Sequence, residues 1–318
     1  MKETQGKTIA AGPYENRPLP YASSSIDADE TRVLFLSNRA GGWNLYSAPI
    51  ASGAAVQLTD SGKVCPSSPV LSAAEPYLYY AAGGRAARLH LDTLEERTLA
   101  DFDGAVLDSL SLNADETVLV AVVRKDASDA LARIQTDGSD ARIFFDPPRS
   151  IRRAHCCPAN PLWVLYSSRS EQRMWTVTIR GWKDRPLYLH RPDESVECEA
   201  FLGKSETVLF IARNGELKAI ERNGERLRPA ADIQARSAAA SRCGRWIAVE
   251  TLDPPGVLAL INAETGQTRP LFHINSGGKR MRLSFSPSGR RLVFEERIAG
   301  RSAARVVSMS AAGLQPSR

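Results

Sequence analysis

A short motif recurs along the whole chain: a polar or small-residue turn followed by about four apolar residues that read as a strand. Examples are DADETRVLFL, NADETVLVAV and SPSGRRLVFE. One residue from each turn marks the repeat: Glu30, Glu75, Glu116, Asn160, Lys204, Gly244 and Gly289. Successive markers are 45, 41, 44, 44, 40 and 45 residues apart, and this spacing is typical of four-stranded propeller blades. The repeat predicts a ring of blades rather than two unrelated domains.

Each unit continues with further strands and tight turns. Alternating strands such as WNLYSAP and RMWTVTI follow the first apolar strand, and turns such as Asp137-Gly138 and Asn223-Gly224 come next. Asn-Gly and Asp-Gly between alternating strands are strong hairpin signals. No stretch of useful length shows the 3.6-residue period of a helix. The sequence therefore predicts an all-β protein.

Seven markers predict a seven-bladed β-propeller that forms a single domain over residues 1–318. The expected blades are approximately 18–62, 66–102, 106–146, 151–191, 195–230, 236–272 and 280–310. The seventh unit lacks an outer strand of its own, and the N-terminal segment GKTIAAG can supply one. Because a ring must be closed to hide its strand edges, residues 6–12 are expected to pair with residues 303–309.

Composition limits the compartment and the partners. No apolar run reaches the roughly 18 residues that span a bilayer, and the first 20 residues lack the apolar core of a signal peptide. Five cysteines, an odd number in a long chain, favour reduced thiols. We therefore expect a cytoplasmic protein without a membrane partner. The chain also lacks the Gly-x-Ser-x-Gly motif of hydrolases.

Charge is concentrated in the last third of the chain. Residues 236–318 hold 13 Lys and Arg against 5 Asp and Glu, whereas the net charge of the whole chain is only +5. A basic region favours an anionic ligand, although a solvated basic face would have the same composition. Nucleic acid is the less favoured ligand, because the basic residues are neither gathered in a run nor interleaved with aromatic residues.

Two resemblances sharpen this prediction. The first unit, VLFLSNRAGGWNLYSAPIASGAAVQLTD, resembles a TolB-type or WD40-like β-propeller repeat. The segments CCPANPLWVLY, QRMWTVTIRG, RPLYLHRPDESVECEAF and RLSFSPSGRRLVF resemble the oligogalacturonate lyase family. The second resemblance implies a divergent member of a family of seven-bladed propellers that cleave short pectin fragments by β-elimination. Its cofactor is typically Mn²⁺, held by three histidines and a glutamine, with a further histidine as the base.

The residues that the resemblance implies for this chemistry are mostly replaced. Cys198 stands where the base histidine belongs, and Ser237 where the first metal histidine belongs. The last metal motif reads Arg280-Met281-Arg282-Leu283, and the glutamine position falls near Gly277. Of the reacting set only the arginine matches, as Arg173. Arginine is permanently charged and glycine has no side chain, so neither can replace such metal ligands. We therefore expect no metal cofactor of the family type and possible loss of catalysis.

Arg280 and Arg282 suggest a substitute for the ion. They are two residues apart on an expected inner strand, so their side chains should share one face, toward the central channel. Two guanidiniums there could bind uronate carboxylates directly. Alternatively, both arginines pair with local acidic residues or are solvated in the channel.

Two further residues are candidates for substrate contact. Cys198 could act as a thiolate near arginine, but Glu197 and Glu199 flank it, and a buried structural cysteine is the favoured alternative. His155 begins the inner strand of the fourth unit and could contact a ligand or replace the base, although a lone histidine is more often structural.

Two functions from different classes follow. The chain is either an oligogalacturonate lyase-like propeller that binds or cleaves short uronate oligosaccharides, an anionic ligand, or a non-catalytic propeller that binds protein partners. The substrate-contacting set expected for the first function is Arg173, Arg280, Arg282, His155 and Cys198.

Overall fold

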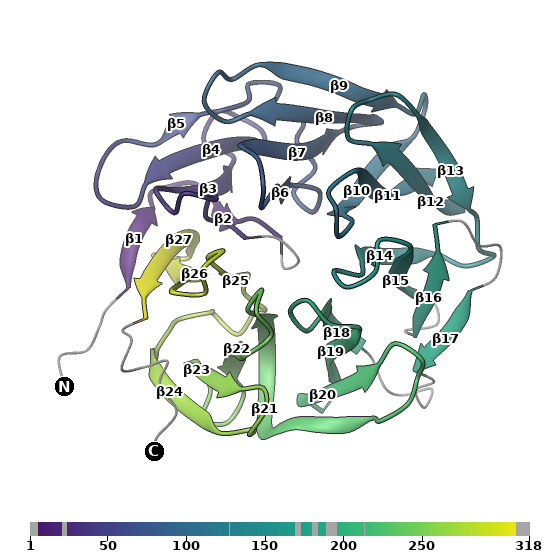
Figure 1. Cartoon of the computed structure of the whole chain (residues 1–318). Helices are drawn as coiled ribbons and strands as arrows, with labels where there is room; N and C mark the ends of the chain where they lie inside the picture. Colours follow the sequence, from purple (N-terminus) through teal and green to yellow (C-terminus); the bar gives the residue numbers. More distant parts are fainter. Residues whose placement is uncertain are drawn as a thin grey trace.

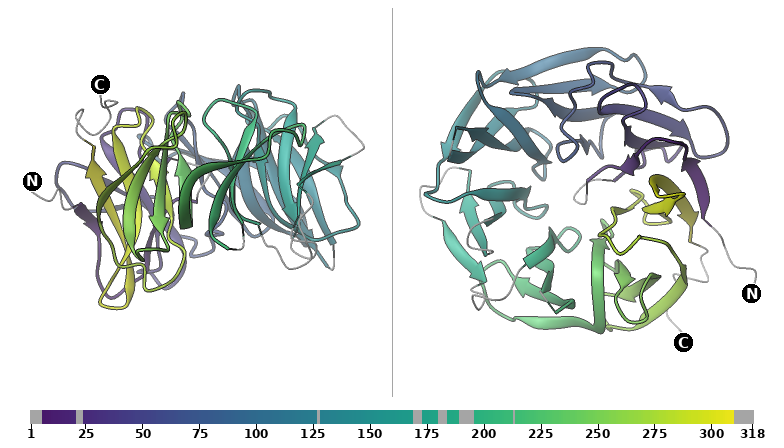
Figure 2. Two further views of the ribbon diagram at one scale, coloured as in Figure 1. Left: turned by 90° about the horizontal axis from the view of Figure 1, so that it is seen from below. Right: turned by 180° about the vertical axis from the view of Figure 1, so that it is seen from behind.

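The computed structural model describes residues 6–20, 24–126, 128–168, 173–179, 184–188, 196–212 and 214–309. Throughout these residues the regular structure is β-strand, and the all-β prediction is confirmed. No helix within this described part of the chain has the length and apolar character needed to cross a membrane. Figures 1 and 2 show the sheets standing side by side in a ring, and each four-stranded sheet has one strand at the centre and one at the rim.

The first four sheets each contain four antiparallel strands in chain order. The first two comprise β2 (Asn16–Pro18), β3 (Arg32–Ser37), β4 (Asn44–Pro49) and β5 (Val56–Gln57), then β6 (Val70–Leu71), β7 (Tyr77–Ala82), β8 (Arg85–His90) and β9 (Glu96–Asp101). The next two comprise β10 (Val106–Leu112), β11 (Val118–Lys125), β12 (Ser128–Gln135) and β13 (Ala141–Phe145), then β14 (Ile151–Cys156), β15 (Trp163–Ser168), β16 (Met174–Thr178) and β17 (Arg185–Tyr188).

The rest of the ring consists of a seven-stranded sheet and a final four-stranded sheet. The larger one comprises β18 (Val196–Phe201), β19 (Thr207–Ala212), β20 (Glu216–Glu221), β21 (Arg228–Ala240), β22 (Trp246–Thr251), β23 (Val257–Asn262) and β24 (Thr268–His273). The final one comprises β25 (Leu283–Phe285), β26 (Arg291–Ile298), β27 (Arg301–Ser308) and β1 (Lys7–Ala10).

The core lies between neighbouring sheets. Strands β3 and β11, each second from the centre of its sheet, are largely apolar on both faces and almost completely buried, as expected for a strand packed between two layers. Rim strands such as β9 and β24 are largely exposed. One apolar cluster, for instance, joins Leu34 and Leu36 of β3 to Leu78 and Tyr80 of β7.

Strand β21 is continuous where two blades had been expected to meet. Its first half pairs with β20 and its second half with β22, with register shifts in both ladders. The expected limits 230 and 236 therefore fall within one strand of 13 residues. The expected boundary between residues 191 and 195 lies outside the described residues.

The N-terminal strand β1 pairs antiparallel with β27. Lys7 lies opposite Val306, Thr8 opposite Arg305 and Ala10 opposite Ala304. Residues from the start and the end of the chain thereby share one sheet (Figure 1).

Serine hydroxyls join adjacent inner strands around the centre. The Oγ of Ser111 on β10 accepts a hydrogen bond from the backbone N of Cys156 on β14, at 2.9 Å. In the same way the Oγ of Ser237 on β21 accepts from the backbone N of Met281, at 3.0 Å. Because these bonds are buried, they are strengthened by the surrounding low dielectric and hold the inner strands in register with one another.

Candidate functional site

A cavity of about 260 Å³ opens at the end of the ring where the inner strands begin. We call it the basic cavity; its charged lining residues are Arg17, Arg153, Lys279, Arg280, Arg282, Arg297 and Glu295. Arg17 comes from β2, Arg153 from the start of β14, and Arg280 and Arg282 from the segment before β25. Inner strands that are distant in sequence therefore contribute cations to one space.

The lining of the basic cavity is strongly positive. Among the described residues that line it, five arginines and one lysine face one carboxylate, that of Glu295. Like charges gathered around a concave surface raise the local concentration of anions. Guanidinium groups also match carboxylates with two parallel hydrogen bonds. The cavity thus suits an anionic ligand that carries carboxylates.

Arg282 is held firmly in this cavity. Its Nη1 donates to the carbonyl oxygen of Pro18 at 2.7 Å, and its Nη2 donates to the carbonyl oxygen of Pro66 at 3.1 Å. Strand β2 and the turn before β6 therefore fix the direction of the guanidinium. Such a preorganised group loses little conformational freedom when a ligand binds.

Arg280 lies at the same cavity but is held by charge. It forms an ion pair with Glu197, which also pairs with Nη1 of Arg152 at 3.1 Å. The Arg280 side chain remains 40% exposed. Both arginines precede β25 instead of lying within an inner strand as expected, yet they line one space. Arg280 therefore lines the same cavity as Arg282, and it also forms the ion pair with a nearby acidic residue that was the alternative interpretation.

Ser237, at the position where the resemblance implies the first metal histidine, belongs to a buried hydrogen-bond network. Its hydroxyl donates to Oε2 of Glu250 at 3.1 Å. Glu250 is fully buried, and its other oxygen accepts from Nη1 of Arg236 at 3.1 Å. Arg236 also donates to Oγ of Ser276 at 3.1 Å. A serine committed to a carboxylate and a backbone N–H, beside arginines, does not fit the histidine-rich donor set of a manganese site.

No group of three or more His, Cys, Asp or Glu within the described ranges has a geometry that could hold a metal ion. The residues present do not fit the metal that the resemblance implies.

A second buried network, at Glu199, was not predicted from the sequence. The Glu199 carboxylate is fully buried and accepts hydrogen bonds from Nη2 of Arg152 at 2.8 Å and from Oγ of Ser167. Burial would raise the pKa of Glu199, but the guanidiniums of Arg152 and Arg153 outweigh it and hold that pKa below its usual value. Glu199 is therefore ionised and anchors the arginines at the start of β14. In the sequence, Glu199 is noticeable only as one of the two acidic residues that flank Cys198.

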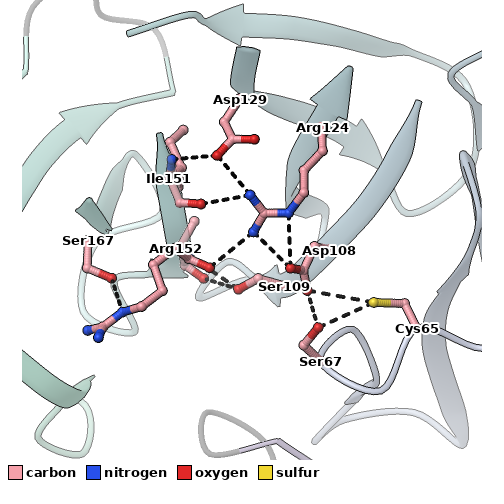
Figure 3. A network of polar contacts seen from close by, with 10 residues as sticks. Cys65, Ser67, Asp108, Ser109, Arg124, Asp129, Ile151, Arg152 and Ser167 are labelled. Carbon is pink, nitrogen blue, oxygen red and sulfur yellow. Dashed lines mark hydrogen bonds and ion pairs between the residues drawn. The ribbon is translucent and has the colours of Figure 1, made fainter. Parts of the chain in front are cut away.

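Arg124 ties the start of β14 to β10 and β12 (Figure 3). It donates to Asp108 and to Asp129, each at 2.8 Å, and to the carbonyl oxygen of Ile151 at 2.9 Å. Burial would raise the pKa of Asp108, but hydrogen bonds from Ser67 and Arg124 lower it below the usual range. This ionised network sets the position from which Arg153 reaches the basic cavity.

His155 lies in a different cavity. A space of about 250 Å³ occupies the centre of the ring at the end where the inner strands finish. We call it the serine cavity; it is lined in part by Ser72, Ser111, Ser241, Ser284, Ser286 and His155. Arg153 and His155 are two residues apart on β14, so one strand contributes to both cavities.

Cys198 and Arg173 line neither cavity. Cys198 is 3% exposed and packs in an apolar cluster with Leu209 and Ala238, and burial raises the pKa of its thiol. Arg173 immediately precedes β16, where its carbonyl accepts from the N–H of Ser168 at 3.0 Å. The five residues expected from the sequence are thus distributed: Arg280 and Arg282 are together, and the other three are elsewhere.

Comparisons with known proteins agree with this architecture. No family model matches the sequence. No curated protein matches it either. Among solved structures, an oligogalacturonate lyase in complex with manganese has a TM-score of 0.83 at 16% identity, covering 98% of this chain and 97% of that one. An oligogalacturonate lyase from Vibrio parahaemolyticus has a TM-score of 0.81 at 15% identity, covering 98% and 96%.

A further solved structure matches this chain over only part of its own length. A puromycin-hydrolyzing peptidase from Mycobacterium tuberculosis has a TM-score of 0.66 at 13% identity and covers 93% of this chain, but only 55% of that protein is matched. The resemblance to oligogalacturonate lyase is therefore confirmed for the β-propeller fold, over nearly the whole chain.

Proposed function

We propose that this protein binds short uronate oligosaccharides in the basic cavity, and that arginine side chains take the carboxylate-binding role of a metal ion. The observation that carries the proposal is the lining of that cavity, where five arginines and Lys279 face one carboxylate. The similarity of the fold to solved oligogalacturonate lyases supports the choice of ligand class. Pectin-derived oligogalacturonates carry one carboxylate per sugar and so match several cations at once.

Arg282 and Arg280 have different roles in this proposal. Arg282 is already oriented by two backbone carbonyls and presents a fixed donor to a first carboxylate. Arg280 is half exposed and paired with Glu197, so an incoming carboxylate competes with that glutamate for it. Arg282 therefore provides a preorganised contact for the ligand, whereas Arg280 must exchange Glu197 for the ligand.

No metal-assisted elimination is part of the proposal. The Ser237 and Glu250 network occupies the place of a ligand histidine, and Cys198 is a buried, protonated thiol rather than a base. We therefore propose a binding protein without the manganese-dependent lyase reaction.

We also infer the finer architecture that positions this site. Counting the seven-stranded sheet as two blades joined by β21 gives seven blades, and the pairing of β1 with β27 closes the ring. The proposal includes a single domain and a cytoplasmic location, as expected from the composition.

Isothermal titration calorimetry with digalacturonate and trigalacturonate tests the function. The Arg280→Ala/Arg282→Ala variant should bind at least about tenfold more weakly, because a hydrogen bond to a charged group contributes about 1.5–3 kcal/mol. A matched control, Arg245→Ala/Arg290→Ala, removes two exposed arginines that line neither cavity and should bind like the parent. Equal binding by both variants would contradict the proposal.

Absorbance near 232 nm distinguishes binding from cleavage, because unsaturated uronates absorb there. We expect no increase with digalacturonate, whether or not Mn²⁺ is added. A manganese-dependent increase would restore the lyase function. Absence of both binding and absorbance would favour the alternative of a scaffold for protein partners.

A further inference from the structure

A buried histidine, His155, is among the residues that line the serine cavity. His155 is 5% exposed, and neither ring nitrogen forms a hydrogen bond with any described residue. A buried polar group left without a hydrogen bond is destabilising. His155 is also among the residues that line a cavity of about 250 Å³, so rotation of its side chain toward that cavity would let a bound molecule supply the missing bonds.

Burial also fixes the charge state of His155. It lowers the pKa of the imidazole to about 4, against the opposing influence of Glu199. The ring is therefore neutral at physiological pH, with one N–H donor and one acceptor nitrogen. A hydroxyl group, which both donates and accepts, is the matching partner.

Other groups beside His155 favour the same chemistry. The hydroxyl of Ser111 accepts from the backbone N of Cys156 and lies on the adjacent inner strand, so its proton can still be donated to a ligand. Phe201 and Phe285, each under 10% exposed, line the same cavity and offer apolar faces. Uncharged groups that bind hydroxyls, together with aromatic side chains, form the kind of surface that a sugar ring requires.

The rim of the serine cavity is cationic. Lys204 and Arg242 line it from the turns after β18 and β21, and both are exposed. The two turns touch, since a Cβ on Gly203 would lie 2.3 Å from the backbone N of Gly244. Neither cation has an ion pair among the described residues, while the nearby Glu116 binds Ser72 and the backbone N of Ala73. The rim therefore carries net positive charge.

We propose that the serine cavity is a second binding site, for a small hydroxylated anion of monosaccharide size. A hydroxyl of the ligand would bond to His155 and Ser111, and its anionic group would face Lys204 and Arg242. The site is independent of the uronate-oligosaccharide proposal, because it uses other residues at the other end of the ring.

Calorimetry with three probes tests the site: galacturonate, galactose 1-phosphate and galactose. The titrations are made on the Arg280→Ala/Arg282→Ala protein, so that the basic cavity contributes little. We expect one-to-one binding of at least one of the two anions, at least about tenfold tighter than that of neutral galactose. The stronger anion identifies whether the group is a carboxylate or a phosphate ester.

Two added changes assign the binding to the serine cavity. His155→Phe and, separately, Lys204→Ala/Arg242→Ala should each weaken it at least tenfold, whereas Arg245→Ala/Arg290→Ala should not. Because Lys204 and Arg242 are exposed, their replacement keeps the proposal testable even if His155→Phe fails to fold. The ¹⁵N resonances of His155 should also shift when the anion is added. Absence of binding by both anions, or binding unchanged by the Lys204→Ala/Arg242→Ala replacement, would overturn the proposal.

Discussion

Arg282 and Glu199 illustrate what determines function at the scale of the residue. Arg282 could be selected from the sequence because two arginines replace an expected metal motif. Glu199 could not, because a bulge in β18, with Cys198 at a φ of 54°, decides which neighbouring side chain is buried. The residue types predicted the positive charge of the site. The local backbone conformation determined which acidic residues are buried and form ion pairs with the arginines.

His155 should make stability depend on pH. Its folded pKa of about 4 is below the ordinary value of 6.5, so the unfolded chain binds its proton first. Stability is therefore lost as pH falls from about 6.5 toward 4, by about 2 kcal/mol between pH 7 and pH 5 at 1.36 kcal/mol per unit. Urea unfolding at the two pH values measures this loss.

The matched variant for this measurement is His155→Phe, which cannot be protonated. Its stability should change by less than about 1 kcal/mol over the same interval. Glu199 does not obscure the comparison, because its lowered pKa means that its contribution is lost only below about pH 4.5. An equal pH dependence in both proteins would contradict a buried neutral His155.

Cys243 should be the thiol that reacts first with a maleimide. It is exposed, and although its partial burial opposes ionisation, hydrogen bonds with Ser241 and the backbone of Arg245 lower its pKa. Cys156, Cys157 and Cys198 are buried, and thiolate access controls reactivity. Mass spectrometry after brief alkylation of the native protein should find Cys243 modified and these three unmodified. Equal labelling of Cys198 would contradict its placement in the core.

At the scale of the element, strands that repeat could be predicted and the junctions between them could not. Alternation of apolar residues and Gly-containing turns marks individual strands, because each physical signal lies within a few residues. The continuity of β21 depends instead on whether residues 231–235 bend or stay extended between two ladders. That choice depends on tertiary packing, and the sequence suggested an interruption there.

Removal of residues 1–12 should lower the melting temperature by more than about 5 °C. Deletion leaves β27 with an unpaired edge and exposes apolar surface of β26 and β27, and a loss of 1 kcal/mol shifts the melting point by about 2–4 °C in proteins of this size. Differential scanning calorimetry measures the change. Deletion of residues 1–5 alone is the control and should have little effect. An unchanged melting point in the longer deletion would mean that β1 does not close the ring.

At the scale of the whole molecule, cations gather at both ends of the central channel while carboxylates are engaged within the walls. The net charge of +5 is small, yet Glu199 and Glu250 are fully buried beside their arginines. Part of the positive charge is thus gathered at the two cavities. The composition predicts that the net charge is positive, but only the folded ring determines where the positive charge is concentrated.

Binding of trigalacturonate should therefore weaken as salt rises. Between about 50 and 500 mM NaCl the Debye length falls from about 14 to about 4 Å, so charge attraction at the open basic cavity is increasingly screened. We expect at least about a fivefold loss of affinity, measured by calorimetry. Galactotriose, which is neutral, is the control and should show no such trend. A salt-independent affinity for trigalacturonate would indicate that its carboxylates do not contact the arginines.

The meeting of β1 and β27 in one sheet has a practical consequence for protein engineering. Because the two ends of the fold already lie side by side, a short linker could join them and new termini could be opened elsewhere, as in a circular permutant. The Asp137-Gly138 turn between β12 and β13 is a suitable opening, since it lies at the exposed end of a hairpin. The middle of β21 is the least suitable, because a cut there would interrupt a single strand that serves two ladders.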